Sequence, residues 1–197
     1  MMKPQMITRR FFAFLAGVSL AITTSSFAQP AWIGEPLEKA GPSDAQPCNW
    51  IEFHGSRAND ALRIAFRSAH PIDFNRGAAY CVYLDADNNR NTGFRGGGND
   101  FPIGADYLLQ GIFLFRYTGD GTGWAWTQIG EVPHEVAGNW ASYTLNASLL
   151  PITGASVGAM LYGDNTAPGV GGNRVDVMPA GALRAGGGGP FIAIPAN

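Results

Sequence analysis

The chain has 197 residues, of which 13 are basic and 15 acidic, so its formal net charge at pH 7 is −2. This balance argues against nucleic acid as a partner, because binding to a phosphate backbone requires a basic surface. After the N-terminal region, no stretch approaches the roughly 18 uninterrupted apolar residues that a membrane-spanning helix needs, so we expect no membrane span.

The N-terminal segment 1–28 has the pattern of a cleaved signal peptide. A basic region with Arg9 and Arg10 precedes a short apolar run, and small residues end the segment at Ala28. The paired arginines resemble the twin-arginine signal, and the general secretory route is the alternative. The segment holds three basic residues and no acidic residue, so residues 29–197 carry a formal charge of −5. We therefore expect a periplasmic or secreted bacterial protein.

The remaining 169 residues suffice for one domain with a hydrophobic core and are few for two. The segments 29–50 and 181–197 contain few patterned apolar residues, and the second is rich in glycine. We interpret them as an extended N-terminal arm and a C-terminal arm. The expected domain therefore spans residues 51–180.

Within the domain, short apolar stretches recur between clusters of Gly, Asn, Asp and Pro, and helical periodicity is almost absent. This spacing predicts an all-β fold, a two-sheet antiparallel β-sandwich. In 61–67, three apolar residues alternate with polar ones, which is typical of a strand with one solvated face. The run 107–117 predicts a long strand with a bulge or bend at Gly111. The predicted strands are 51–54, 61–67, 78–84, 107–117, 124–126, 131–136, 140–145, 157–162 and 174–177.

The two cysteines of the chain, Cys48 and Cys81, are expected to form a disulfide. Their even number and the expected export both favour this pairing. By restricting the unfolded chain, such a bridge would contribute about 3–4 kcal/mol to stability. Two buried thiols without a disulfide are the alternative.

The stretch LDADNNRNTGF places Asp85, Asp87, Asn89 and Asn91 at alternate positions directly after an apolar strand. Calcium prefers six to eight oxygen ligands, which carboxylate and amide side chains at this spacing can turn toward one point. The helix-flanked calcium loop is excluded, because the required glycine and glutamate are missing. The alternative interpretation is a polar turn, since Asp and Asn favour such turns.

The order of motifs along the chain resembles that of a known superfamily. YCVYLDADNNRNTGF is followed by GADY at 104–107, a tryptophan-containing hairpin, LNASLL at 145–150 and VDVMP at 175–179. This order resembles the DOMON-like β-sandwich superfamily, in particular domains similar to family 9 carbohydrate-binding modules. The resemblance covers about residues 51–180, and its most specific part is the pairing of the Asp-rich loop with GADY.

This resemblance implies a jelly-roll-like sandwich with a structural calcium ion. The ion would lie near Asp85, Asp87 and Asn89, with Asp106 approaching from the next strand. It also implies a saccharide or a similar small molecule as the ligand.

Carbohydrate modules present aromatic platforms to the apolar C–H faces of sugar rings. The candidate platforms are Trp124, Trp126 and Trp140, with Tyr117 and Tyr162 ranked lower. Trp124 and Trp126 lie two residues apart on one strand face, which also suits a sandwich core. The expected function is therefore a binding module, with the choice of platform open.

Two other functional classes stay open. Some DOMON domains bind haem between a methionine and a histidine, and the candidates for such ligands are Met160, Met178, His54, His70 and His134. An exported lyase or hydrolase on the same fold is the other class. The chain has no HExxH or GxSxG signature, and no spacing indicates catalytic residues.

Overall fold

The computed structural model describes residues 29–58, 60–146 and 148–196. The predicted signal peptide at 1–28 lies outside these residues. The described part of the chain forms β-strands and short 3-10 helices, so the all-β prediction is confirmed. None of its helices is both long and apolar enough to cross a membrane.

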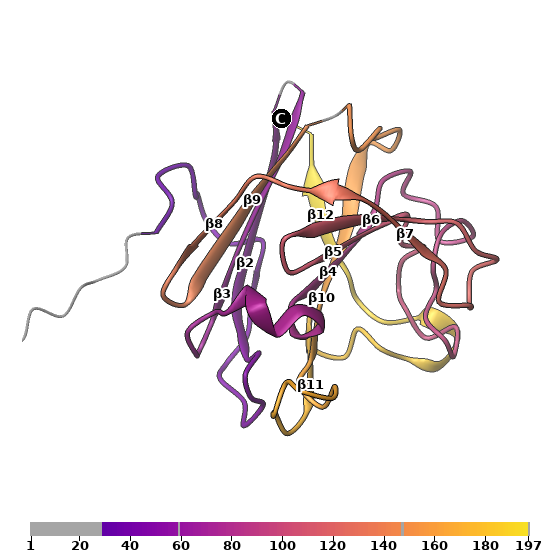
Figure 1. Ribbon diagram of the computed structural model, residues 1–197. Helices are drawn as coiled ribbons and strands as arrows, with labels where there is room; N and C mark the ends of the chain where they lie inside the picture. Colours follow the sequence, from indigo (N-terminus) through magenta and orange to yellow (C-terminus); the bar gives the residue numbers. More distant parts are fainter. Residues whose placement is uncertain (1–28, 59, 147, 197) are drawn as a thin grey trace, which may run out of the picture.

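The strands form two antiparallel sheets that face each other as a β-sandwich (Figure 1). The five-stranded sheet has the order β1-β2-β3-β9-β8. Its strands are β1 (Glu38–Lys39), β2 (Trp50–Ala58), β3 (Ala61–Ser68), β9 (Trp140–Asn146) and β8 (His134–Ala137). The sequence therefore predicts the class of architecture correctly.

The seven-stranded sheet has the order β11-β10-β4-β5-β6-β7, with β12 paired to β10. Its strands are β11 (Val175–Met178), β10 (Ser156–Asp164), β4 (Cys81–Asp85), β5 (Tyr107–Gln110), β6 (Phe113–Tyr117), β7 (Trp126–Glu131) and β12 (Ile192–Pro195). The 3-10 helix η1 (Phe74–Ala79) precedes β4, and η2 (Ala185–Gly187) precedes β12.

Two predicted strands are each divided in the structure. The run 107–117 is a hairpin of β5 and β6, in which Gly111 adopts φ 57°, a conformation that favours glycine. The run 131–136 ends β7 in one sheet and begins β8 in the other. Pro133 lies at this crossing, where the missing N–H interrupts no ladder.

The C-terminal segment is part of the sandwich. Strand β12 pairs antiparallel with β10, and Ile192 and Ile194 are buried in the core. The N-terminal segment is also attached, because β1 pairs with β2. The folded unit therefore extends beyond the predicted range 51–180.

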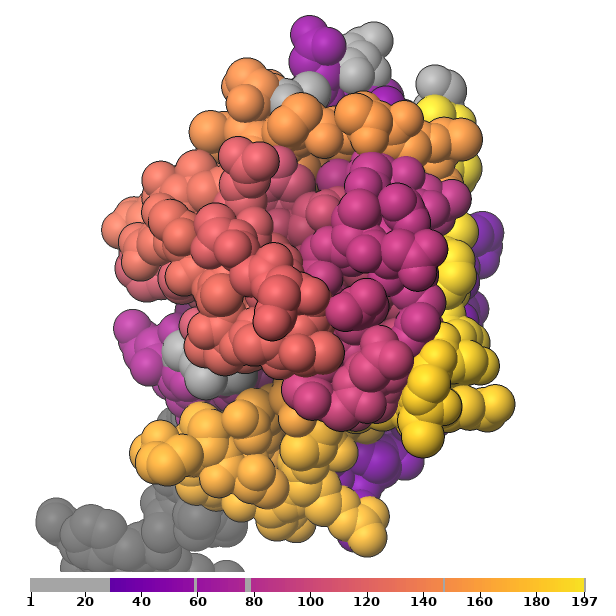
Figure 2. Space-filling view, turned by 90° about the vertical axis from the view of Figure 1, so that its right-hand side faces the viewer, coloured from indigo at the N-terminus to yellow at the C-terminus, as the bar shows by residue number. Residues whose placement is uncertain are grey.

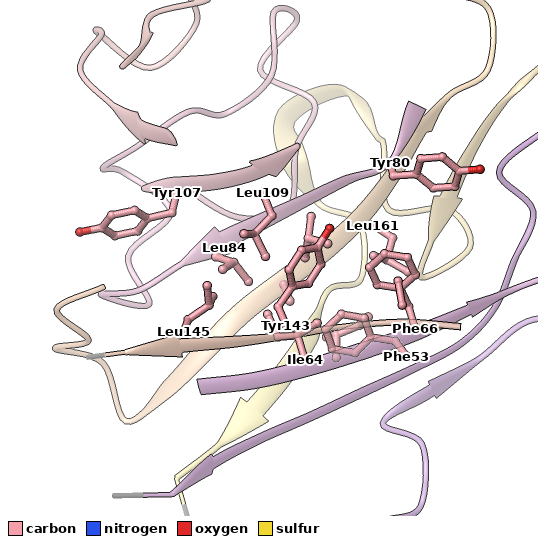
Figure 3. Packing of buried hydrophobic residues seen from close by; sticks show 14 of the residues in the cluster. Phe53, Ile64, Phe66, Tyr80, Leu84, Tyr107, Leu109, Tyr143, Leu145 and Leu161 are labelled. Carbon is pink, nitrogen blue, oxygen red and sulfur yellow. The ribbon is translucent and has the colours of Figure 1, made fainter. Parts of the chain in front are cut away.

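The main core fills the space between the two sheets. Leu62, Ile64 and Phe66 of β3 are buried, as their alternation with polar residues predicts. Figure 3 shows Leu84 and Leu109 of the other sheet pointing toward this layer. Full burial of one such side chain contributes about 1.5–3 kcal/mol.

The predicted disulfide between Cys48 and Cys81 is not present in the structure. Strand β4 is buried on both faces, with Val82 facing the main core and Cys81 the outer face. Cys48 lies in the main core, where its thiol donates a hydrogen bond to the carbonyl of Ala79 at 2.7 Å. The sheet thus separates the two sulfur atoms, which the sequence spacing alone does not indicate.

Asp176 of the edge strand β11 connects its sheet to the start of β2 in the other sheet. Its Oδ2 accepts a hydrogen bond from the backbone N–H of Trp50 at 2.8 Å, and its carbonyl accepts one from the Trp50 indole at 3.1 Å. We expect Asp176→Ala to lower the free energy of unfolding by about 1–3 kcal/mol, because a buried N–H then lacks its acceptor. Asp176→Asn keeps a side-chain oxygen, so its free energy of unfolding, measured in urea, should fall less. Equal losses in the two variants would refute this explanation.

Candidate functional site

The loop 86–106 builds most of the candidate site. It leaves the sandwich at the end of β4 and returns at the start of β5, and these two strands are antiparallel neighbours. Asp85 and Asp106 therefore lie at adjacent strand ends, although 21 positions separate them in the sequence. An antiparallel bridge between Phe94 and Ala105 joins two parts of the loop to each other.

Three of the predicted metal ligands come together in the structure. Asp85, Asp87 and Asp106 each offer a carboxylate oxygen, and these three oxygens lie within 4.8 Å of one another. Asp85 is only 2% exposed, and the other two are half-buried. A partly desolvated group of carboxylates at this spacing suits a hard cation such as calcium.

The charges of the cluster oppose one another. Burial, together with the nearby carboxylates of Asp106 and Asp87, raises the pKa of Asp85 to about 6. Burial also raises the pKa of Asp106, which lies close to Asp87. A bound cation would favour the ionised forms of all three groups.

Backbone amides hold the carboxylates in place. Asn89 N–H donates to Asp85 Oδ1 at 3.2 Å and to Asp87 Oδ1 at 2.9 Å. Ala86 N–H donates to Asp106 Oδ2 at 2.9 Å. The loop therefore contains the turns that the alternative interpretation expects, and the same turns orient the carboxylates toward one another.

The two predicted asparagine ligands, Asn89 and Asn91, lie in the same loop. Both are exposed, and Asn89 Oδ1 accepts a hydrogen bond from the backbone N–H of Asn91 at 3.1 Å. The main-chain carbonyls of Asn89 and Thr92 instead approach Gly104, where an added Cβ would lie 2.7 Å and 1.9 Å from their oxygens. The glycine of the GADY motif thus permits this close approach.

A cavity of about 300 Å³ lies on the outer face of the seven-stranded sheet. Its wall combines β4, the loop 86–106, the β6–β7 turn and the end of β10. The lining residues are Cys81, Tyr83, Phe94, Gly97, Gly98, Asp100, Phe101, Gln110, Trp124, Tyr162, Asp164 and Leu183. Figure 2 shows the loop (magenta) beside the β6–β7 turn (salmon), which agrees with the hydrogen bond from Arg95 N–H to the Gly121 carbonyl at 2.7 Å.

The predicted platforms Trp124 and Trp126 differ in exposure. Trp124 is 63% exposed and lines the cavity. Trp126 is half-buried, and its ring lies 6.0 Å from Trp124 and 5.0 Å from Tyr117. Both tryptophans pack on Phe94, at 5.8 Å and 5.6 Å between ring centroids. Of the two predicted platforms, Trp124 is therefore the exposed one, and Trp126 packs beside it.

No protein-family model, curated protein or solved structure matches this chain. The DOMON-like resemblance accordingly remains an expectation based on motif order.

Trp140 is not a surface platform. It is only 7% exposed and lies in β9 of the five-stranded sheet. The guanidinium of Arg67 lies 5.8 Å from the centre of its ring, and the ring of His54 lies 5.5 Å away. This burial does not fit the predicted role of Trp140 as an exposed platform, because neighbouring side chains cover it.

The sequence patterns rank Tyr162 low as a ligand residue. They do not single out three other aromatic residues of the cavity, Tyr83, Phe94 and Phe101. One signal was present, since β4 is apolar at consecutive positions and must therefore be covered on both faces. The sequence does not indicate which segment supplies the cover.

The candidate haem ligands do not assemble around this cavity. Met160 fills the outer aromatic cluster, and Met178 lies in the main core. His54 is buried, with Nε2 3.0 Å from Glu52 Oε2. No histidine is among the described residues that line the cavity, so the haem hypothesis gains no support from it.

A larger cavity of about 450 Å³ lies against the outer face of β8 and β9. One of its walls is formed by Pro30, Ala31 and Trp32. This wall directly follows the residues outside the described part of the chain. We therefore take the smaller aromatic cavity, whose described walls belong to the folded domain, as the candidate ligand site.

Proposed function

We propose that the protein is an exported β-sandwich module that is stabilised by calcium and binds a saccharide or a similar small ligand. The observation that carries this proposal is the aromatic cavity with Trp124 at its surface. Its volume of about 300 Å³ lies in the range of small-molecule sites. Aromatic faces pack on the C–H faces of a sugar ring, and Gln110 offers an amide for hydrogen bonding to hydroxyl groups.

The calcium ion would act on the ligand site through the loop 86–106. The three carboxylates lie where this loop leaves β4 and where it returns to β5, and its middle carries Phe94 and Phe101 of the cavity wall. An ion held by Asp85, Asp87 and Asp106 would fasten both ends of the loop to β4 and β5. The proposed role of the metal is therefore to position the aromatic wall, with no chemical step of its own.

Gly97 allows a direct test of the cavity. It lines the cavity, its φ is outside the left-handed region, and a Cβ at this position meets no atom within 4 Å. We expect Gly97→Trp to remove at least about nine-tenths of the retention on a glycan array or affinity gel, because the new side chain occupies the ligand volume. The melting temperature should stay within about 2 °C of the wild type, since a surface substitution changes stability little.

Gly34→Trp is the matched control, because its Cβ also meets open space and it lies in the N-terminal segment. This variant should bind as the wild type does. Unchanged binding by Gly97→Trp would place the ligand site elsewhere. Depolymerisation of a polysaccharide by the purified wild type would replace the binding module with an enzyme.

A further inference from the structure

The charged residues that line the aromatic cavity are acidic. Asp100 and Asp164 are the charged residues among its described lining, which includes no lysine or arginine. The ion pairs of the described chain involve other carboxylates, those of Glu52 and Asp44. Asp164 Oδ1 accepts one hydrogen bond, from the hydroxyl of Thr166 at 3.2 Å. Two carboxylates thus face the cavity without a cationic partner among the described residues.

Aromatic rings form the other walls of the cavity. The ring of Tyr83 lies 4.8 Å from that of Phe101 and 6.2 Å from that of Tyr162, in edge-to-face arrangements. Phe101 and Tyr162 lie 6.4 Å apart, so the three rings form one corner. The face of an aromatic ring attracts a cation within about 6 Å of its centre. The walls and the carboxylates therefore favour the same kind of ligand.

We infer that the cavity binds a small organic ammonium ion. This inference rests on the proposed function, because it takes the cavity as the ligand site and narrows the class of ligand. A positively charged nitrogen with carbon substituents would neutralise Asp100 and Asp164 and pack its alkyl groups on Tyr83, Phe101 and Trp124.

The two charges also disfavour other ligands. A neutral sugar would donate hydroxyl hydrogen bonds to the carboxylates but would leave their two charges without a cationic partner. Both carboxylates would repel an acidic sugar or a phosphate. A hydrated metal ion would gain little from aromatic walls, because hard cations prefer oxygen ligands.

Two pairs of probes test the inference in isothermal titration calorimetry on the purified protein with calcium. Choline is compared with its neutral carbon isostere, and glucosamine with glucose. We expect each ammonium probe to bind at least about tenfold more tightly than its neutral counterpart. Tighter binding of choline than of glucosamine would identify a quaternary ammonium group, and the reverse order an amino sugar.

Variants of the two carboxylates complete the test. Asp100→Asn and Asp164→Asn should each weaken binding of the ammonium probes about tenfold and leave the neutral probes unchanged. Glu131→Gln, at an exposed acidic residue of β7, is the matched control and should change neither.

The outcomes separate this inference from the proposed function. Equal affinities for charged and neutral probes, or retention of array glycans without binding of either ammonium probe, overturn the inference and leave a ligand site. If none of the four probes and no array glycan binds, both the inference and the proposed function are contradicted.

Discussion

Removing calcium with a chelator is expected to lower the melting temperature of the protein by about 5–10 °C, and added calcium should restore it. An ion that binds only the native state at a hundred times its dissociation constant contributes about 2.7 kcal/mol. In a domain of this size, about 1 kcal/mol corresponds to about 2–4 °C. The measurement is a thermal melt followed by circular dichroism, with magnesium as a comparison ion.

The variant Asp85→Asn distinguishes a metal site from a turn that is held by hydrogen bonds alone. Because burial and neighbouring charges raise the pKa of Asp85 to about 6, its ionised form opposes folding above that pH when no cation is bound. The variant should lose the response to calcium and melt no lower than the wild type in chelator. Glu131→Gln should keep the full response. If the melting temperature of the wild type is the same with and without calcium, the proposed calcium site is wrong.

Trp124→Ala and Trp140→Ala should have opposite effects on binding and stability. Trp124 is 63% exposed at the cavity, so its removal should weaken ligand binding more than about tenfold and leave the melting temperature nearly unchanged. Trp140 is 7% exposed, so its removal should lower the free energy of unfolding by about 3–5 kcal/mol. Ligand affinity below the melting transition should stay near that of the wild type.

For both variants, the ligand affinity is measured by titration with the same ligand, and the free energy of unfolding is measured in the same urea series. Each variant serves as the control for the other, because both remove one indole. Loss of binding in Trp140→Ala at full native population would restore Trp140 as a ligand residue. Full affinity in Trp124→Ala would show that the exposed ring is not the platform.

Local patterns in the sequence predict much of this fold. The alternation of Leu62, Ile64 and Phe66 with polar residues identifies a strand and its buried face, since side chains alternate across a sheet. The spacing of Asp85 and Asp87 after an apolar strand predicts a cluster of carboxylates. The DOMON-like motif order adds Asp106, and the structure brings all three together.

Other features depend on which segments meet in space. Trp140 and Trp124 have equal apolar character, but Trp140 is buried, and the side chains of Arg67 and His54 lie beside its ring. Cys48 and Cys81 have a spacing compatible with a bridge, but they face opposite sides of a sheet. These relations are non-local, so no window of sequence contains them.

The sequence by itself determined the all-β class, the strand faces and the acidic residues that come together at the ends of β4 and β5. The tertiary structure decided where the aromatic cavity lies, because the loop 86–106 folds back over the outer face of one sheet. Only that fold places Phe101 and Asp100 beside Tyr162 and Trp124. Strand periodicity fixes the direction of a side chain, whereas a cavity needs walls from distant segments.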